Sequence, residues 1–220
     1  MNKKIIVVGA TGLVGRALVN KLLAKSEIEK VITLTRRPLL INHKKFVNHV
    51  VDFSRLNQCA EYFSGVDILF SCLGTTKKQA GSIKQQRKVD LHYQYQAAQQ
   101  AKFAGVTSYF LVSSSGAYAR SLSPYLKMKG ELEDKVIQLG FERSVIFRPS
   151  LLIGKREQSR VGEAFAAQLM PLLAYVPFFK RYRPIKGTEV ATKMANIALS
   201  NNDAREQTPC VKSYNLDQIF

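Results

Sequence analysis

Short apolar runs alternate with segments of helical periodicity along the first 150 residues of the chain. The apolar runs cover residues 4–8, 31–35, 46–51, 68–72, 109–113 and 144–147. Apolar residues recur at helical spacing between them, over residues 13–23, 56–63, 88–103 and 125–139. Continuous apolar runs are typical of strands buried on both faces of a sheet. The alternation therefore predicts an α/β fold, a doubly wound parallel sheet with helices on both faces.

The last third of the chain has a different pattern. Residues 161–179 are rich in Ala, Leu and aromatic residues, are interrupted by Pro171 and Pro177, and lead into a basic run at 180–183. Residues 188–199 predict a further helix, with Thr188 as its N-cap and Glu189 in its first turn. We expect one domain over residues 1–220, in which 150–186 form a small substrate cap. The alternative is a membrane-surface or partner-binding helix, which Pro171 disfavours.

A glycine-rich turn joins the first predicted strand to the first predicted helix. It reads Gly9-Ala10-Thr11-Gly12-Leu13-Val14-Gly15. The first glycine suits a tight turn, the second a close approach of the backbone to a pyrophosphate, and the third close packing of helix on strand. The free N–H groups of a helix N-terminus also attract phosphate. The turn predicts a Rossmann dinucleotide site, and its G-x-x-G-x-x-G spacing resembles the extended and atypical short-chain dehydrogenases/reductases.

Three further strand ends are candidates for cofactor contacts. The second strand ends in Arg36 and Arg37 with no acidic residue, which favours the 2′-phosphate of NADP over the ribose hydroxyls of NAD. The alternative is that these arginines point into water. In the same superfamily the end of the third strand, here Asp52 and Phe53, holds the adenine. Residues beside the expected nicotinamide ribose follow the fourth strand, namely Leu73, Gly74 and Thr75.

Tyr125 and Lys129 are the candidate acid–base pair. They lie four residues apart at the start of a predicted helix and therefore share one face. An ammonium beside a phenol favours the phenolate, which suits a tyrosine that gives and takes a proton. Lys129 can also hold the nicotinamide ribose. A serine from the preceding strand end would orient the carbonyl, with Ser114 as first candidate and Ser115 as second.

Composition and charge narrow the class of protein. Hydrophobic residues make up 46% of the 220 residues, enough for one α/β domain with a full core. The net charge of +17 indicates an acidic ligand such as a phosphorylated cofactor, or a solvated lysine-rich surface. We find no nucleic-acid-binding motif, no metal-ligand spacing among the 3 cysteines, and no apolar run of membrane-spanning length. These features lead us to expect a cytoplasmic protein.

Several motifs narrow the resemblance to one family. They are Ser71-Cys72-Leu73-Gly74-Thr75-Thr76, Lys88-Val89-Asp90, Ser113-Ser114, Tyr125-Leu126 with Lys129-Gly130-Glu131, and Phe147-Arg148-Pro149 through Gln158-Ser159-Arg160 with Gly162-Glu163. Together they resemble the Tat-interacting oxidoreductase family of atypical short-chain dehydrogenases, from the first strand to about Leu199. The resemblance implies NADPH binding, with a poorly defined substrate. Asp90 stands where the superfamily often has the Asn of a proton relay.

Two functional hypotheses follow. The first is an NADP-dependent oxidoreductase that acts on a small carbonyl or alcohol and prefers NADPH to NADH. The second is an NADPH-binding regulatory protein that acts through a protein partner. Tyr125 and Lys129 favour the first hypothesis, whereas Asp90 and the basic surface keep the second open. The sequence leaves open whether the chain has a protein partner or forms a homodimer.

Overall fold

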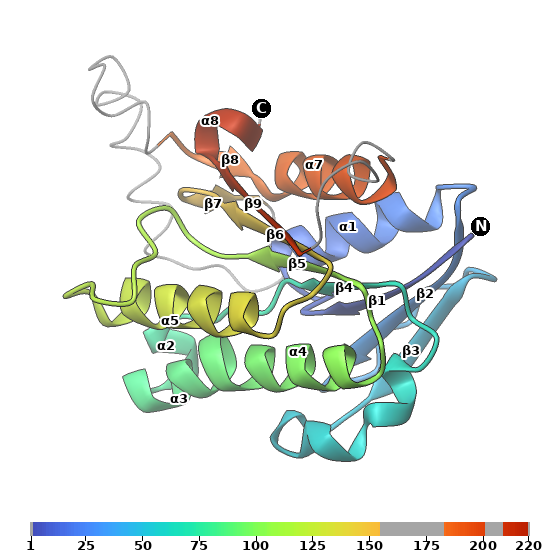
Figure 1. The fold of residues 1–220 in the computed structure, drawn as a ribbon, viewed down its shortest axis with the longest axis horizontal. Helices are drawn as coiled ribbons and strands as arrows, with labels where there is room; N and C mark the ends of the chain where they lie inside the picture. The colour runs from blue at the N-terminus through green and yellow to red at the C-terminus, as the bar shows by residue number, and fades with distance from the viewer. Residues whose placement is uncertain (1, 155–182, 201–208, 220) are drawn as a thin grey trace.

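A computed structural model describes residues 2–154, 183–200 and 209–219, and it contains a seven-stranded parallel sheet (Figure 1). The strand order is β3-β2-β1-β4-β5-β6-β9. The strands are β1 (Lys3–Val8), β2 (Ile28–Thr35), β3 (Phe46–Val50), β4 (Ile68–Ser71), β5 (Ser108–Val112), β6 (Arg143–Arg148) and β9 (Cys210–Asn215). This order confirms the predicted Rossmann architecture. The chain reverses its direction across the sheet between β1 and β4, which is where such sheets bind ligands.

Helices cover both faces of the sheet (Figure 1). One face carries α1 (Leu13–Leu23), α7 (Gly187–Leu199) and α8 (Leu216–Ile219), and the other carries α4 (Gln94–Phe103) and α5 (Pro124–Gln138). Side chains of β1 alternate between the two cores, with Ile5 and Val7 in one and Ile6 and Val8 in the other. Both faces of β1 are therefore dry, which explains its continuous apolar sequence.

Some predicted elements differ in detail. Residues 56–63 form no α-helix, because two 3₁₀ turns, η1 (Phe53–Gln58) and η2 (Ala60–Phe63), meet at Cys59. The predicted helix over 88–103 begins with a π-helical turn, η3 (Lys88–Tyr93), before α4. Two short helices, α2 (Lys77–Ala80) and α3 (Ile83–Arg87), precede it. The sheet also gains β9, which the sequence analysis did not predict.

Helix α7 begins one residue earlier than expected, and its cap is different. Lys186, not Thr188, is the N-cap residue. The backbone N–H of Lys186 donates a 2.8 Å hydrogen bond to the Glu189 carboxylate. Thr188 lies inside the first turn, where its carbonyl accepts a bond from the Thr192 hydroxyl. The Glu189 carboxylate thus provides a hydrogen-bond acceptor for the backbone at the start of the helix, so a Thr N-cap is not needed.

A small second sheet lies at the two ends of the predicted cap. Strands β7 (Leu152–Ile153) and β8 (Ile185–Lys186) pair in parallel. Residues 155–182, which include the apolar stretch and most of the basic run, lie outside the described residues. No helix within the described part of the chain is long and apolar enough to cross a membrane.

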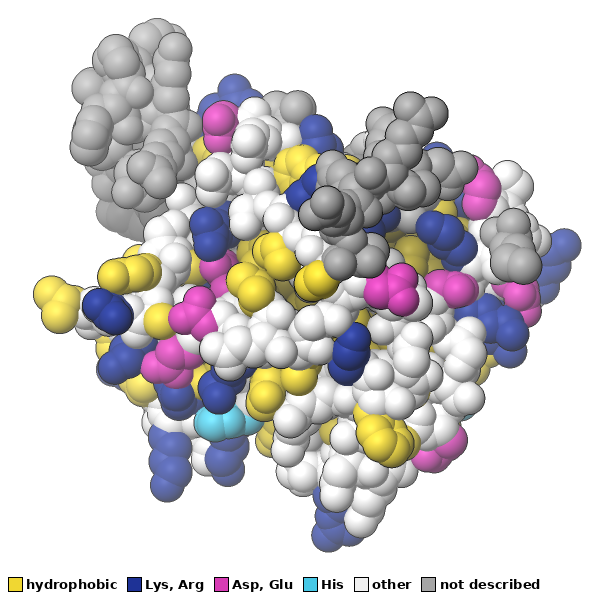
Figure 2. All heavy atoms as spheres, in the orientation of Figure 1, with side chains coloured by type: hydrophobic (Ala, Val, Ile, Leu, Met, Phe, Trp, Pro, Cys, Tyr) yellow, Lys and Arg dark blue, Asp and Glu magenta, His cyan; other side chains and the backbone are white. Residues whose placement is uncertain are grey.

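Basic side chains are spread over one face of the molecule. On the face shown in Figure 2, Lys and Arg side chains occur over several elements, with Asp and Glu side chains among them. On this face, the distribution fits a solvated surface better than a single binding patch for a polyanion.

Candidate active site

The glycine turn packs tightly against its surroundings at two positions. Gly9 has a φ of +83°, and a Cβ added there would lie 2.4 Å from the Cys72 carbonyl carbon. A Cβ added to Gly15 would lie 2.2 Å from the Gly9 carbonyl oxygen. Both distances are far below a van der Waals contact, so only glycine lets strand, turn and helix meet here. The turn also brings the ends of β1 and β4 together at the switch point.

Gly12, unlike Gly9 and Gly15, has room around it for a side chain. Its nearest neighbour to an added Cβ would be the Gly9 carbonyl oxygen at 3.4 Å, and the residue is exposed. Gly12 is also the N-cap of α1 and makes no side-chain cap hydrogen bond. Thr11 beside it is exposed, Leu13 is half-buried, and Val14 is buried in the core and can contribute only its backbone. The open backbone and uncapped helix end fit the pyrophosphate of a dinucleotide.

The residues predicted to contact the adenosine part of the cofactor lie at the ends of β2 and β3. Arg36 and Arg37 follow β2 and are exposed, so both guanidinium groups are accessible to a ligand. Asp52 caps the η1 turn instead, because its carboxylate accepts bonds from the Ser54 N–H and hydroxyl at 2.8 and 2.7 Å. Phe53 is buried in the core beside Tyr93, which leaves only its backbone for adenine.

Tyr125 and Lys129 lie on the first turns of α5. Ser123 caps this helix by accepting a bond from the Leu126 N–H, and Pro124 occupies its first turn. Tyr125 is half-buried, whereas Lys129 is 2% exposed. The Lys129 Nζ lies 3.4 Å from the Val112 carbonyl oxygen of β5, to which it donates a hydrogen bond. The predicted pair is therefore placed at the carboxyl edge of the sheet.

Asp90 provides the counter-charge to Lys129. Its Oδ1 lies 3.4 Å from the Lys129 Nζ, and both side chains are almost fully buried. Burial is the largest single influence on Lys129 and lowers its pKa, but the charges of Asp90, Tyr125 and Glu133 together outweigh it and raise the pKa. Lys129 therefore stays an ammonium in a dry site.

Asp90 also binds the loop after β4. Its Oδ2 accepts a 3.0 Å hydrogen bond from the Thr75 N–H. The adjacent Gly74 is so close that an added Cβ would lie 3.6 Å from the Asp90 Oδ1. Leu73 and Thr75 are half-buried and Gly74 is exposed, so this loop can meet a ligand at the edge of the sheet.

The candidate serines lie at the end of β5. Ser114 and Ser115 are half-buried, and the Ser114 hydroxyl donates only a 3.5 Å bond to the Ser115 carbonyl. Ser113 is buried, and its hydroxyl has no hydrogen-bond partner among the described residues. The sequence analysis did not select Ser113, because a run of three serines carries no signal that separates them.

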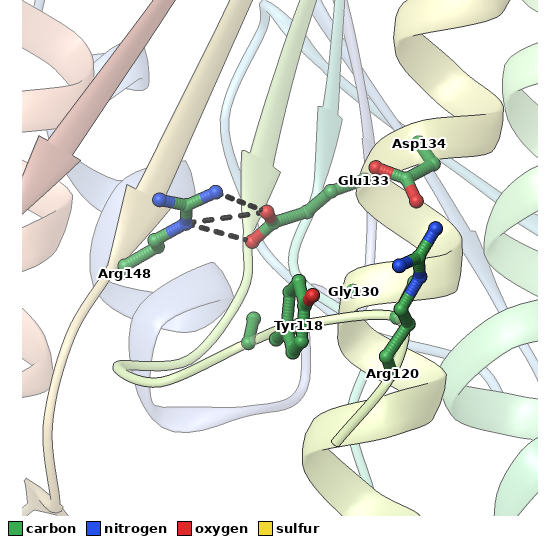
Figure 3. A pocket seen from close by; sticks show the side chains of 8 residues that line it. Tyr118, Arg120, Gly130, Glu133, Asp134 and Arg148 are labelled. Atoms are coloured by element: carbon green, nitrogen blue, oxygen red, sulfur yellow. Dashed lines mark hydrogen bonds and ion pairs between the residues drawn. The ribbon is translucent and has the colours of Figure 1, made fainter.

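An ion pair supports the far side of helix α5. The Arg148 Nε lies 3.1 and 3.2 Å from the two carboxylate oxygens of Glu133, which is 3% exposed. Figure 3 shows the two side chains pointing toward one another beside Gly130 and Tyr118, in a pocket of about 430 Å³. A Cβ on Gly130 would lie 2.2 Å from the Ala119 nitrogen. Gly130 therefore lets α5 pack against the loop after β5, and the ion pair fixes α5 against the end of β6. The sequence analysis assigned neither feature to the site.

Comparisons with known proteins identify the family of the chain. A family described as NAD(P)H-binding matches residues 9–165. Protein HTATIP2 of Rattus norvegicus is 39% identical over 168 residues, covering 75% of this chain and 69% of that protein. Protein FMP52, mitochondrial, of Debaryomyces hansenii is 34% identical over 217 residues, covering 97% of this chain and 95% of that protein.

Solved structures share the fold at low identity. MoeE5 in complex with UDP-glucuronic acid and NAD has a TM-score of 0.74 at 16% identity, covering 97% of this chain and 76% of that chain. The oxidoreductase ylbE from Lactococcus lactis has a TM-score of 0.66 at 19% identity, covering 96% of this chain and 90% of that chain. These likenesses confirm the fold class.

The expected cytoplasmic location is wrong. Several fungal relatives, including FMP52 of Debaryomyces hansenii and of Eremothecium gossypii, are named as mitochondrial proteins. The expectation depended on the lack of a long apolar run, and that feature tests only for a membrane span. It carries no information about the compartment in which a protein works.

Motifs, fold and relatives thus lead to one assignment. The resemblance to the Tat-interacting oxidoreductases, first based on short motifs, is confirmed by the match to HTATIP2 over three-quarters of the chain. The chain belongs to the NAD(P)H-binding family, with HTATIP2 and FMP52 among its relatives.

Proposed function

We propose that the chain is an NADP-dependent oxidoreductase that reduces a small carbonyl compound. The observation that carries this proposal is Lys129, a buried ammonium one helical turn after the half-buried Tyr125. Burying a lysine is costly, and the fold compensates it with Asp90. A surface Tyr and Lys on an amphipathic helix would need no such arrangement.

The chain's own residues supply proton transfer and binding. When bound, the cofactor supplies a hydride to the carbonyl carbon. Tyr125 then donates its hydroxyl proton to the carbonyl oxygen, which becomes the alcohol oxygen. Lys129 holds the nicotinamide ribose and supports the charge left on Tyr125, and Ser114 or Ser115 orients the carbonyl.

The preference for NADPH rests on the exposed end of β2. Arg36 and Arg37 offer two guanidinium groups there, and arginine binds phosphate through a charge-assisted fork. Gly12 and the start of α1 take the pyrophosphate between this end and Tyr125. The proposed cofactor thus follows the carboxyl edge of the sheet from β2 to β5.

Replacing Tyr125 with Phe tests the mechanism. A panel of aldehydes, ketones and quinones is screened with NADPH oxidation as the signal. With a substrate found, Tyr125→Phe should still bind NADPH while reduction falls roughly 10²–10⁴-fold, the usual contribution of general acid catalysis. Tyr62→Phe is the matched control, because Tyr62 stacks on His49 at the far edge of the sheet. Turnover by Tyr125→Phe at the parent rate would exclude the mechanism.

A further inference from the structure

Two buried side chains hold Thr75, a residue of the loop after β4. The Gln86 Nε2 donates a 3.2 Å hydrogen bond to the Thr75 carbonyl oxygen. The Thr75 N–H donates a 3.0 Å hydrogen bond to the Oδ2 of Asp90, which lies one turn after Gln86. Gln86 is 4% exposed and Asp90 is 0% exposed. Thr75 is therefore fixed through both of its backbone polar groups, and the loop cannot change its path there without losing a hydrogen bond.

The burial of Gln86 is unusual for the segment in which it lies. The structure describes every residue of α2 and α3, and Gln86 is the one residue of these two helices that is buried. Burying an amide is unfavourable unless the amide is hydrogen-bonded. The two helices are instead attached to the fold by polar contacts, since Arg87 pairs with Glu131 of α5 and Gln86 binds Thr75. The contact between Gln86 and Thr75 also joins the end of this segment to its beginning.

Asp90 alone cannot bind both backbone groups of Thr75. A carboxylate only accepts hydrogen bonds, so Asp90 can bind the Thr75 N–H but not the Thr75 carbonyl. The other oxygen of Asp90 lies 3.4 Å from the Lys129 Nζ. The Gln86 amide supplies the donor that the carboxylate lacks. Gln86 and Asp90 together thus hold Thr75 while Asp90 remains paired with Lys129.

The loop held in this way borders both halves of the proposed cofactor site. At its start, a Cβ added to Gly9 of the glycine turn would lie 2.5 Å from the Leu73 nitrogen. Further along, Thr75 contacts Asp90 and is connected through it to Lys129. Strand β4 pairs with β1 at the switch point, where open α/β sheets bind their ligands. The loop therefore extends from the turn proposed for the pyrophosphate to the lysine proposed for the nicotinamide ribose.

We propose that Gln86 is a positioning residue that holds the loop after β4 in the shape that receives the nicotinamide half of the cofactor. The proposal rests on the proposed function, since it concerns the same cofactor, but it does not require that a carbonyl compound is reduced. Without the Gln86 amide the loop gains conformations that the cofactor must exclude when it binds, and this weakens binding. The adenosine end lies at β2 and β3, on the other side of β1, and should bind as before.

Two ligands measure the two halves of the site separately. NADPH fills both halves, whereas 2′-phospho-AMP carries the adenosine with its phosphates and lacks the nicotinamide half. Gln86→Met keeps the length of the side chain and removes the amide. Isothermal titration should show NADPH binding weakened roughly 3- to 10-fold, the equivalent of one net hydrogen bond, and 2′-phospho-AMP binding at the parent affinity. Gln85→Met is the matched control, because Gln85 is exposed in the same helix and should leave both affinities unchanged.

A shorter amide guards against loss of folding. In Gln86→Asn the side chain stays polar but is one methylene shorter, so its amide no longer reaches the Thr75 carbonyl at hydrogen-bond distance. This variant should show the same selective loss of NADPH affinity, and urea unfolding shows which of the two variants is folded. Parent affinity for NADPH in a folded Gln86 variant would overturn the proposal. An equal loss of affinity for both ligands would also overturn it, because Gln86 would then support only the stability of the fold.

The two proposals fail in different ways. If Gln86→Met weakens NADPH binding selectively but the parent reduces no carbonyl compound, Gln86 holds the cofactor loop and the proposed function fails. If a substrate is reduced but the Gln86 variants bind NADPH as the parent does, the function holds and Gln86 is not a positioning residue. If the parent binds NADH more tightly than NADPH, the proposed preference fails, and NADH with ADP takes the place of the two ligands in the same comparison.

Discussion

The two ends of the proposed cofactor site are built in opposite ways. At the nucleotide end, Arg36 and Gly12 are exposed and interact with solvent. At the acid–base end, Lys129, Asp90 and Glu133 are all at most 3% exposed and each has an oppositely charged neighbour. Exposed groups that contact only a ligand can be substituted without destabilising the fold. Charges that the fold itself neutralises cannot be removed one at a time.

The largest effect should come from Lys129→Met. The substitution leaves the Asp90 carboxylate buried without its ammonium, and breaking a buried pair typically costs about 3–5 kcal/mol. Urea unfolding of parent and variant measures the loss. Because the pKa of Lys129 is raised in the folded chain, its contribution is fully present below the ordinary value of 10.5 and is lost as pH rises through the folded value. If Lys129→Met were as stable as the parent at pH 7, the buried charges of the acid–base end would not be needed for the fold, and the contrast with the nucleotide end would be wrong.

Two valine substitutions in the glycine turn distinguish a glycine that the fold requires from a glycine that ligand binding requires. In Gly15→Val the new Cβ meets the Gly9 carbonyl oxygen at 2.2 Å, so we expect a loss of about 3 kcal/mol or an unfolded chain. In Gly12→Val the nearest atom lies at 3.4 Å, and the chain should fold. NADPH fluorescence titration should show little binding to Gly12→Val, since the side chain fills the path of the pyrophosphate. Normal NADPH binding would make this loop an ordinary turn.

Arg36→Ala should have the smallest effect and act on binding alone. Losing a charge-assisted phosphate contact weakens NADPH binding by roughly 10- to 100-fold. NADH binding and the unfolding midpoint should stay near the parent values, because Arg36 is exposed. Isothermal titration with both cofactors provides the measurement. Equal losses for NADPH and NADH would show that Arg36 does not read the 2′-phosphate.

The sequence predicted the fold well because its signals are local. Strand β1, the glycine turn and helix α1 were expected within a residue of their observed ends. Strand β9 was missed, because its burial alternates along the strand and Val211 is 45% exposed. An edge strand of this kind shows no continuous apolar run, so its pairing with β6 depends on the tertiary structure.

The site was predicted less completely, because several of its contacts join residues of different elements. Tyr125 and Lys129 are four residues apart, so one helix places both. The partner of Lys129 comes from a π-helical turn, and the sequence identified Asp90 only as a departure from the usual Asn. Arg148 lies at the end of β6 and Glu133 lies in α5, and no local sequence pattern predicts that the two residues pair. Buried charges are compensated over long sequence separations, which periodicity cannot detect.

The place of β9 in the sheet has a consequence for biosynthesis. Strand β6 pairs with β5 on one side, and its other edge is covered by β9. Residues 210–215 emerge from the ribosome after all the proposed site residues. Until then β6, which ends at Arg148, presents an unpaired edge that can join a strand of another chain. The nascent protein is therefore most vulnerable to aggregation in the interval between synthesis of β6 and synthesis of β9, and chaperone demand should be concentrated there.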